Sequence, residues 1–210
     1  MLRLEGYADH EHHLPAAGKF IIAQFDQENI IIYQAFKDSI AEYAVKHQRF
    51  GGVDYDFNRI TWLKPSFLWM MYYSGWAKKE NQENILAITL SREGFDELLS
   101  GAVLQHKLSS SYAGSETYSN EITIQWEHYY DLFGTKTDRY AAKIGIQGEA
   151  QRRYNEKWIR NIENITSYVR QQQQLLQENK MTQLMLPHER AYAPDDLTLL
   201  RKLDATTISL

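Results

Sequence analysis

The chain has 210 residues, 43% hydrophobic and 24% charged, which is typical of one soluble globular domain. Its net charge of −4 argues against bulk non-specific binding of nucleic acid, although a local basic patch remains compatible with it. The absence of Cys excludes disulfides, thiolate metal sites and Cys nucleophiles. The chain shows no signal-peptide pattern and no apolar run of membrane-spanning length, so we expect a cytoplasmic protein without membrane contact.

The first 18 residues are polar, and we expect them to form a flexible arm ahead of a single globular domain over residues 19–205. The arm contains the run Asp9-His10-Glu11-His12-His13, whose side chains are ordinary metal ligands. Short polar termini are usually mobile, so we expect no metal site there. The sequence alone does not decide whether this cluster binds metal.

Two strands are predicted over residues 20–25 and 30–35, joined by a polar turn at residues 26–29, and together they indicate a hairpin. Three consecutive Ile residues in the second strand predict burial on both faces and a central place in the sheet. Gln34 lies among apolar neighbours, and buried amides need hydrogen-bond partners. Gln34 is therefore either a structural hydrogen bonder, which is the ordinary case, or a ligand contact.

Residues 59–76 form the densest apolar and aromatic stretch and hold three of the five Trp residues. Pro65 suits the first turn of a helix, and the residues after Ser66 are apolar all round, which predicts a buried helix at about residues 65–73. Ser74 and Gly75 give a plausible stop. This helix is too short to cross a bilayer.

The start of that helix is a candidate phosphate site. Unpaired N–H groups and a partial positive charge gather at helix N-termini, where they bind anions. Lys64 and Ser66 lie at this end, and Arg59 lies on the approach to it. The alternative is that Ser66 only caps the helix while Lys64 and Arg59 are solvated.

Periodicity also predicts a helix over residues 38–47, a strand over 84–90, and a helix from a Ser91 cap to about residue 100. Arg92 falls in the first turn of the last of these, where a cation is unfavourable to the helix dipole. That position favours a non-local role for Arg92, although a solvated surface Arg is the common alternative. Residues 108–120 lack periodicity and are predicted to be a loop.

Residues 121–127 alternate cleanly between apolar and polar side chains, which predicts a strand. Gln125 and Glu127 share its polar face at the strand end, and His128 follows. A carboxylate beside a His is suited to acid–base chemistry. The alternative is an exposed polar face of a half-covered strand.

The remainder predicts a strand at residues 142–146, a helix at 149–154, a helix from Thr166 to about 179 and a last helix near 195–203. Residues 157–165 fit a helix almost as well as a strand. Strands and helices are interleaved without regular βα repetition, which predicts an α+β fold with a mixed or antiparallel central sheet and flanking helices. Signature loops of dinucleotide-binding proteins, P-loop NTPases, kinases, zinc proteases and serine hydrolases are absent from the sequence.

Several strings resemble, in order, the family catalogued as domain of unknown function 4291, over about residues 20–203. They are Ile32-Tyr33-Gln34-Ala35-Phe36, Arg59-Ile60-Thr61-Trp62-Leu63-Lys64-Pro65-Ser66, Leu86-Ala87-Ile88, Ile124-Gln125-Trp126, Ile144-Gly145-Ile146 and Ile165-Thr166. The chain departs from the family pattern at Tyr73, where Arg is usual, and at Ala142-Lys143, where Arg-Ser is commoner. The resemblance implies no activity. A weaker likeness in arrangement to ADP-ribosyltransferase-type folds would give roles to Tyr33-Gln34, Ser66 and Glu127.

The first functional hypothesis is a nucleotide- or nucleic-acid-directed enzyme, an ADP-ribosyltransferase-like transferase with NAD as the candidate cofactor. Its ligand would be an anionic small molecule or nucleotide, or RNA or DNA. The catalytic candidates are Glu127 and Gln125. The ligand-binding candidates are Tyr33, Gln34, Arg59, Thr61, Trp62, Lys64, Ser66 and Arg92.

Two alternatives belong to other classes. A non-catalytic module for phosphate or nucleic acid predicts a pocket with no carboxylate nearby. A protein–protein interaction domain predicts that the aromatic residues of the central stretch are exposed. The sequence does not predict the oligomeric state or the substrate.

Overall fold

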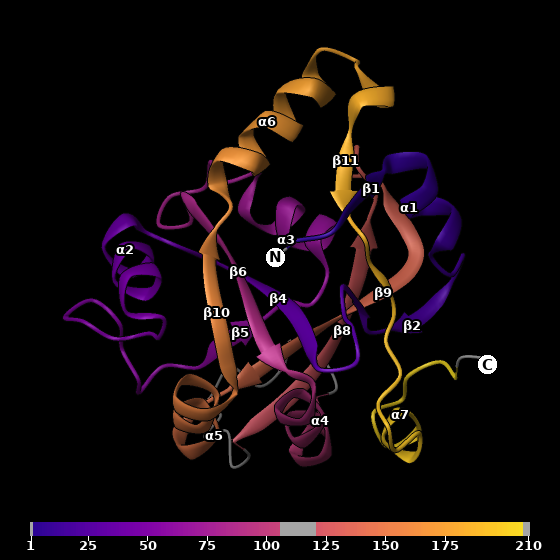
Figure 1. Cartoon of the computed structure of the whole chain (residues 1–210). Helices are drawn as coiled ribbons and strands as arrows, with labels where there is room; N and C mark the ends of the chain where they lie inside the picture. Colours follow the sequence, from indigo (N-terminus) through magenta and orange to yellow (C-terminus); the bar gives the residue numbers. More distant parts are fainter. Residues whose placement is uncertain (1, 106–120, 208–210) are drawn as a thin grey trace, which may run out of the picture.

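The computed structural model describes residues 2–105 and 121–207 and shows a single-domain α+β fold, as predicted (Figure 1). The predicted loop at residues 108–120 lies entirely outside the described residues. Two main sheets dominate the described part, with helices around them. Within residues 2–105 and 121–207, no helix is long and apolar enough to cross a membrane.

The first sheet is antiparallel and has the strand order β10-β6-β4. Its strands are β4 (Asn29–Phe36), β6 (Asn84–Ser91) and β10 (Ile159–Asn164). The segment that sequence left open between strand and helix is therefore a strand, entered through the π-helical turn η1 (Tyr154–Trp158).

The position of β4 differs from the prediction, because it ends the order of its sheet instead of lying at the centre. The outer edge of β4 nevertheless makes backbone hydrogen bonds to other segments. Phe25 bridges Ile30 there, and the Tyr33 N–H donates to the Lys64 carbonyl oxygen at 2.7 Å. This second bridge joins the first sheet to the chain that has just left the second sheet.

The second sheet is mixed and contains five strands. They are β2 (Gly18–Phe20), β5 (Thr61–Leu63), β7 (Val103–Leu104), β8 (Ile122–Tyr130) and β9 (Lys136–Ile146). β8 and β9 are antiparallel, and the other edge of β9 pairs with β2 at residues 139–141 and with β5 at residues 144–146. The predicted strand at 142–146 is thus only the end of a longer strand.

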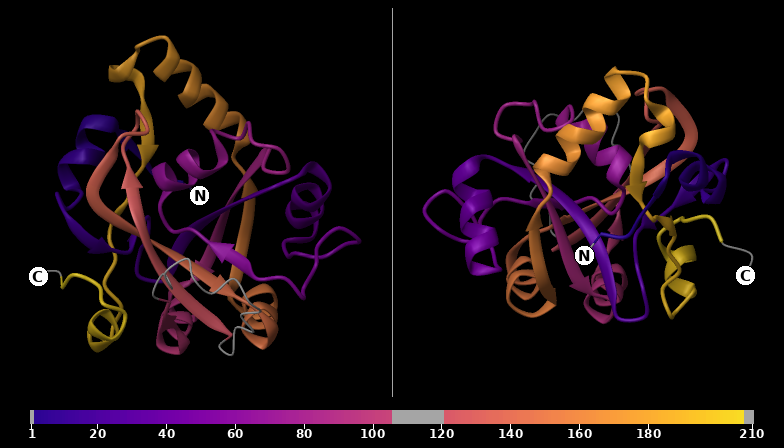
Figure 2. Two further views of the ribbon diagram at one scale, coloured as in Figure 1. Left: turned by 180° about the vertical axis from the view of Figure 1, so that it is seen from behind. Right: turned by 45° about the horizontal axis from the view of Figure 1, so that its top comes forward.

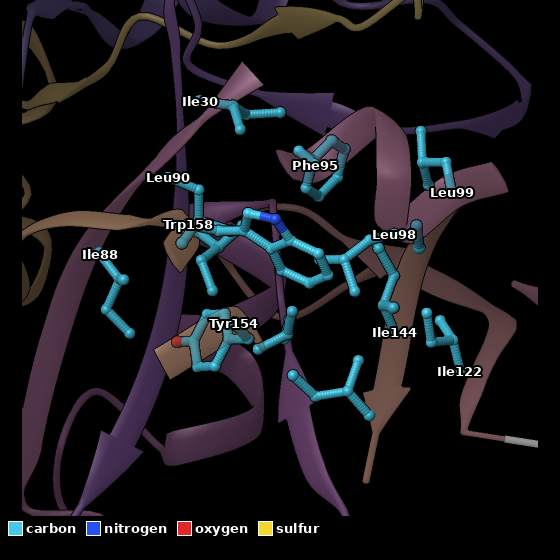
Figure 3. Close-up of a cluster of buried hydrophobic side chains, with 14 of the residues drawn as sticks. Ile30, Ile88, Leu90, Phe95, Leu98, Leu99, Ile122, Ile144, Tyr154 and Trp158 are labelled. Atoms are coloured by element: carbon cyan, nitrogen blue, oxygen red, sulfur yellow. The ribbon is translucent and has the colours of Figure 1, made fainter. Parts of the chain in front are cut away.

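Two hydrophobic cores explain the continuous apolar run in β4. Successive side chains of a strand point to opposite faces. Ile30 and Ile32 accordingly enter a core shared by both sheets, whereas Ile31 and Tyr33 enter a second core on the other face. Figure 3 shows the first core, in which Trp158 lies between side chains of both sheets. The prediction that this strand is buried on both faces is confirmed.

The helices divide between these cores. Helices α2 (Asp38–His47), α4 (Arg92–Gly101) and α5 (Gly148–Arg153) contribute to the first core, and α3 (Phe67–Ser74) and α6 (Thr166–Gln177) contribute to the second. Figure 2 shows α6 and α3 on one side of the sheets, with α4 and α5 at the opposite end. The buried apolar helix is confirmed as α3, which ends at Gly75 in the left-handed region, with a φ of 58°.

The predicted first hairpin strand is divided, because its two halves have different partners. β2 pairs with β9, and β3 (Ile22–Ala23) pairs with β12 (Arg190–Ala191). The hairpin is confirmed only near its turn, where Phe25 bridges Ile30 and the Ile31 N–H donates to the Gln24 carbonyl oxygen. In the turn, the Asp26 carboxylate accepts hydrogen bonds from the backbone of Glu28 and Asn29. The remaining short elements are η2 (Met181–Gln183) and α7 (Thr198–Lys202).

The N-terminal segment, expected to be a flexible arm, is packed against the rest of the domain. β1 (Leu4–Gly6) pairs with β11 (Met185–Pro187), and α1 (Tyr7–His13) follows it. His10 is fully buried, with its Nδ1 3.0 Å from the Pro187 carbonyl oxygen. Glu11 accepts a hydrogen bond of 2.6 Å from the buried Arg139. These partners lie far along the chain, so local composition does not reveal them.

Candidate functional site

A cavity of about 590 Å³ opens beside β5, between the start of α2 and one side of α3. Its size lies within the usual range for small-molecule sites, roughly 300–1,000 Å³. It brings together five of the predicted ligand-binding residues, and its lining adds aromatic side chains such as Tyr73 and the carboxylates of Asp54 and Asp56. The lining includes Gln34, Arg59, Thr61, Trp62, Lys64 and Tyr73.

The alternation of β5 sets the direction of its side chains. Thr61 and Leu63 are buried, and Leu63 belongs to the first core, so Trp62 and Lys64 point to the opposite face. Trp62 pairs with Gly145 of β9, and a Cβ at Gly145 would lie 2.8 Å from the indole. The absence of a side chain at Gly145 therefore lets the Trp62 ring rest on the β9 backbone.

Lys64 is the most unusual polar group of the cavity. The residue is only 6% exposed, and its Nζ lies 4.5 Å from the ring centre of Tyr73 and 5.8 Å from that of Trp69. Among the residues that the structure describes, no carboxylate lies within 4 Å of this amine. Burial, followed by the positive charge of Lys143, lowers the pKa of Lys64 to about 7.

Two further lysines, Lys143 and Lys79, lie close to Lys64. The Lys143 Nζ lies 4.1 Å from the Trp62 ring centre and 3.3 Å from Oε1 of Glu127. The Lys79 Nζ lies 4.9 Å from the ring centre of Tyr73, which it shares with Lys64. Aromatic faces stabilise such cations at close range. Cations and aromatic rings therefore gather around Lys64, whereas the cavity lining farther from it also includes Asp54 and Asp56.

Glu127 lies on the same side of the second sheet as Lys64. Glu127 pairs with Ala141 and Gln125 pairs with Lys143, so all four share a face with Trp62 by strand parity. The negative charge of Glu127 also acts to raise the pKa of Lys64, against the effect of burial. A position on opposite sides of the fold would have removed the enzymatic hypothesis, and this is not the arrangement observed.

The N-terminus of α3, predicted to bind phosphate, already holds a carboxylate of the chain. The Phe67 N–H donates to Oε1 of Glu189 at 2.7 Å, and both residues are fully buried. Ser66 and Tyr33 are buried on this side and do not line the cavity. The Phe67 N–H at the start of α3 is therefore already paired within the chain, which argues against the predicted phosphate site at the helix end.

Gln34 and Thr61 act as supports for the cavity wall. The Gln34 amide donates to the Thr61 hydroxyl and to the Trp62 carbonyl oxygen, each at 3.1 Å. Its oxygen accepts a hydrogen bond of 2.8 Å from Tyr154. The amide is fully used, so Gln34 is a structural hydrogen bonder that fixes β5 beside β4.

Arg92 lies apart from this cavity. Its side chain donates to the Tyr192 hydroxyl and to Asp195, and its N–H donates to the Glu28 carbonyl oxygen beside the start of β4. Gln34 lies five residues further along that strand than Asn29, a span of roughly 17 Å at about 3.3 Å per residue. Its non-local role is to hold the C-terminal segment against α4.

Lys143, Tyr73 and Lys79 were not among the predicted ligand-binding residues, although Tyr73 and Lys143 were noted as departures from the family pattern. Their proximity to Lys64 depends on the pairing of β9 with β5 and on the rotation of α3. In the described residues, no group of three or more His, Cys, Asp or Glu side chains is arranged to hold a metal ion.

A family model for a domain of unknown function, DUF4291, matches residues 20–192, most of the chain. The chain belongs to the DUF4291 family. The match includes both main sheets, the Lys64 cavity and Glu189. No curated protein matches the chain. Tyr73 and Lys143 both lie beside Lys64.

Proposed function

We propose that the Lys64 cavity binds an anionic small molecule of the nucleotide class. The observation that carries this proposal is the buried amine of Lys64. Lys64 lines the cavity, and among the described residues no carboxylate lies within ion-pairing distance of its amine. A buried charge without a partner is costly. An anionic group in the cavity would provide that partner, so binding energy and the stability of the fold would be coupled.

A nucleotide fits the remaining groups better than a simple anion. Arg59 is exposed at the cavity, and its guanidinium suits two-point contact with phosphate. The faces of Trp62 and Tyr73 suit stacking of a planar base. Lys143 and Lys79 do not line the cavity, but they lie against the Trp62 and Tyr73 rings that do, and so add positive potential near it.

The reaction that we propose is a transfer at the ribose of a nucleotide such as NAD, of ADP-ribosyltransferase type. Glu127, with Gln125 beside it on the strand face, is our candidate for hydrogen bonding to a ribose hydroxyl and for stabilising an oxocarbenium-like centre. The position of the Glu127 carboxylate close to Lys64 favours a transfer reaction over a non-catalytic binding module. Trp69 and Phe67 are buried and only Tyr72 of the α3 aromatic residues is largely exposed, which argues against a broad interaction surface built from this helix.

The test is a thermal-shift panel with NAD, ADP-ribose, ATP, GTP, inorganic phosphate and a short RNA. A ligand at 100 times its Kd should stabilise the fold by about 2.7 kcal/mol. We expect a nucleotide to shift the wild type and to lose this effect in Lys64→Ala. Lys46→Ala, which removes an exposed lysine of α2 outside the cavity lining, should respond like the wild type.

A second variant separates base stacking from phosphate binding. Gly145→Ala places a methyl group against the Trp62 indole, so it should weaken nucleotides more than inorganic phosphate. Absence of a shift with every ligand would overturn the proposal. Equal shifts for Lys64→Ala and wild type would move the site away from this cavity.

A further inference from the structure

The surroundings of Lys64 suit a reactive amine as well as a cation. Its Nζ touches aromatic rings instead of carboxylates, it opens on a cavity, and Lys143 and Lys79 lie close by. Desolvation and neighbouring cations are the two means by which proteins keep a lysine amine uncharged and nucleophilic. Both act on Lys64, and the lowered pKa agrees with this geometry.

We propose that the Lys64 amine forms an imine with the aldehyde of a phosphorylated sugar in its open-chain form. This inference rests on the proposed function, because the phosphate places the ligand in the same cavity. The phosphate would be held by Arg59, which lines the cavity, and the charge of Lys143 behind Trp62 would add to its attraction. The Lys64 nitrogen is then left for the carbonyl carbon.

The step is balanced and needs no oxidant or reductant. The neutral nitrogen of Lys64 attacks the carbonyl carbon, and the carbonyl oxygen gains a proton, giving a carbinolamine. The nitrogen loses one proton, and the hydroxyl group, once protonated, leaves as water to give an iminium ion. Loss of the remaining proton from nitrogen gives the neutral imine. Glu127 is the carboxylate whose charge acts on Lys64, so it is our candidate for carrying these protons.

The experiment uses wild-type protein, ribose 5-phosphate and sodium cyanoborohydride, which reduces an imine to a stable secondary amine. Labelled lysines are located by peptide mass spectrometry. We expect labelling at Lys64 to be at least about tenfold faster than at exposed lysines such as Lys46 and Lys78. Inorganic phosphate should slow it, and unphosphorylated ribose should not label Lys64 selectively.

Labelling spread evenly over exposed lysines would overturn the inference, and selective labelling by ribose alone would overturn its phosphate requirement. Lys64→Arg keeps a cation but loses the nucleophile, so it should retain a phosphate thermal shift and give no adduct at residue 64. If Lys64→Arg does not fold, the distribution of labelled lysines in the wild-type protein still tests the inference. A phosphate shift without a Lys64 adduct leaves the proposed function standing and removes only the imine, whereas absence of both removes both.

Discussion

At the scale of single residues, Lys64 and Glu189 show how burial changes the chemistry of an ordinary side chain. Lys64 is an amine whose pKa is lowered to about 7 by desolvation and by Lys143. Glu189 is a carboxyl group whose pKa burial raises well above its ordinary range. Both effects disfavour the charged form in a medium of low dielectric constant. Only Lys64 opens on a cavity.

The depressed pKa of Lys64 predicts the pH dependence of stability. Below about pH 7 both folded and unfolded chains hold the proton, so the cost of burying the charge is complete. Between about 7 and the ordinary value of 10.5 only the unfolded chain holds it, so this cost falls as pH rises. Lys64→Met should be more stable than wild type by a few kcal/mol near pH 7, because each pKa unit corresponds to about 1.4 kcal/mol.

Urea unfolding of both proteins from neutral to alkaline pH measures this difference. The advantage of Lys64→Met should shrink towards pH 10. Parallel stability curves over this range would contradict it. Lys46→Ala serves as the control, because an exposed lysine should give no such trend.

At the scale of elements, α3 contacts Glu189 at its start and Lys64 along one side. Its first N–H is held by Glu189, and its Tyr73 and Trp69 rings cover Lys64. β5 likewise has one face in the first core and the other in the cavity. Both elements were predictable in outline, because an apolar run predicts burial and strand parity predicts which residues share a face. The sequence did not predict which distant residues would contact each face.

Glu189 variants test the start of α3. Glu189→Gln keeps an oxygen for the Phe67 N–H but cannot ionise, so it should be more stable than wild type near neutral pH and similar to it in acid. The sign follows from the raised pKa, since the unfolded chain ionises first as pH rises above 4.5. Glu189→Ala should lose about 2 kcal/mol by leaving a buried N–H unpaired. Chemical denaturation at several pH values gives both results, and a Gln variant no more stable at neutral pH would refute the neutral-acid account.

At the scale of the whole molecule, two sheets share one core and are joined where β4 meets the end of β5. The Tyr33–Lys64 bridge makes this join, so the cavity lies at the junction of the sheets. Clefts between packed elements are common places for ligand sites. The N-terminal segment packs against the rest of the domain through β1, which pairs with β11, and through α1.

Deletion of residues 1–13 should therefore destabilise the whole domain. It removes Glu11 and leaves Arg139, which is 5% exposed, without that partner. Breaking a fully buried ion pair costs about 3–5 kcal/mol, and because Glu11 is 27% exposed we expect a loss at or below the lower end of that range. Denaturant unfolding should show a lower midpoint for the truncated chain, with His12→Ala, an exposed position in α1, as the unaffected control. An unchanged midpoint would mean that the segment is a dispensable arm.

The sequence by itself determined that β4 is buried on both faces, that α3 is an internal helix, and that Gln125 and Glu127 share a strand face. These are properties of local periodicity, which records the side of an element that is apolar. Only the tertiary structure decided that Glu189 closes the start of α3, that the N-terminal segment is packed, and that Lys143 and Tyr73 surround Lys64. Those partners come from distant segments, 122 residues apart for Phe67 and Glu189, and local periodicity carries no information about which distant face an element will meet.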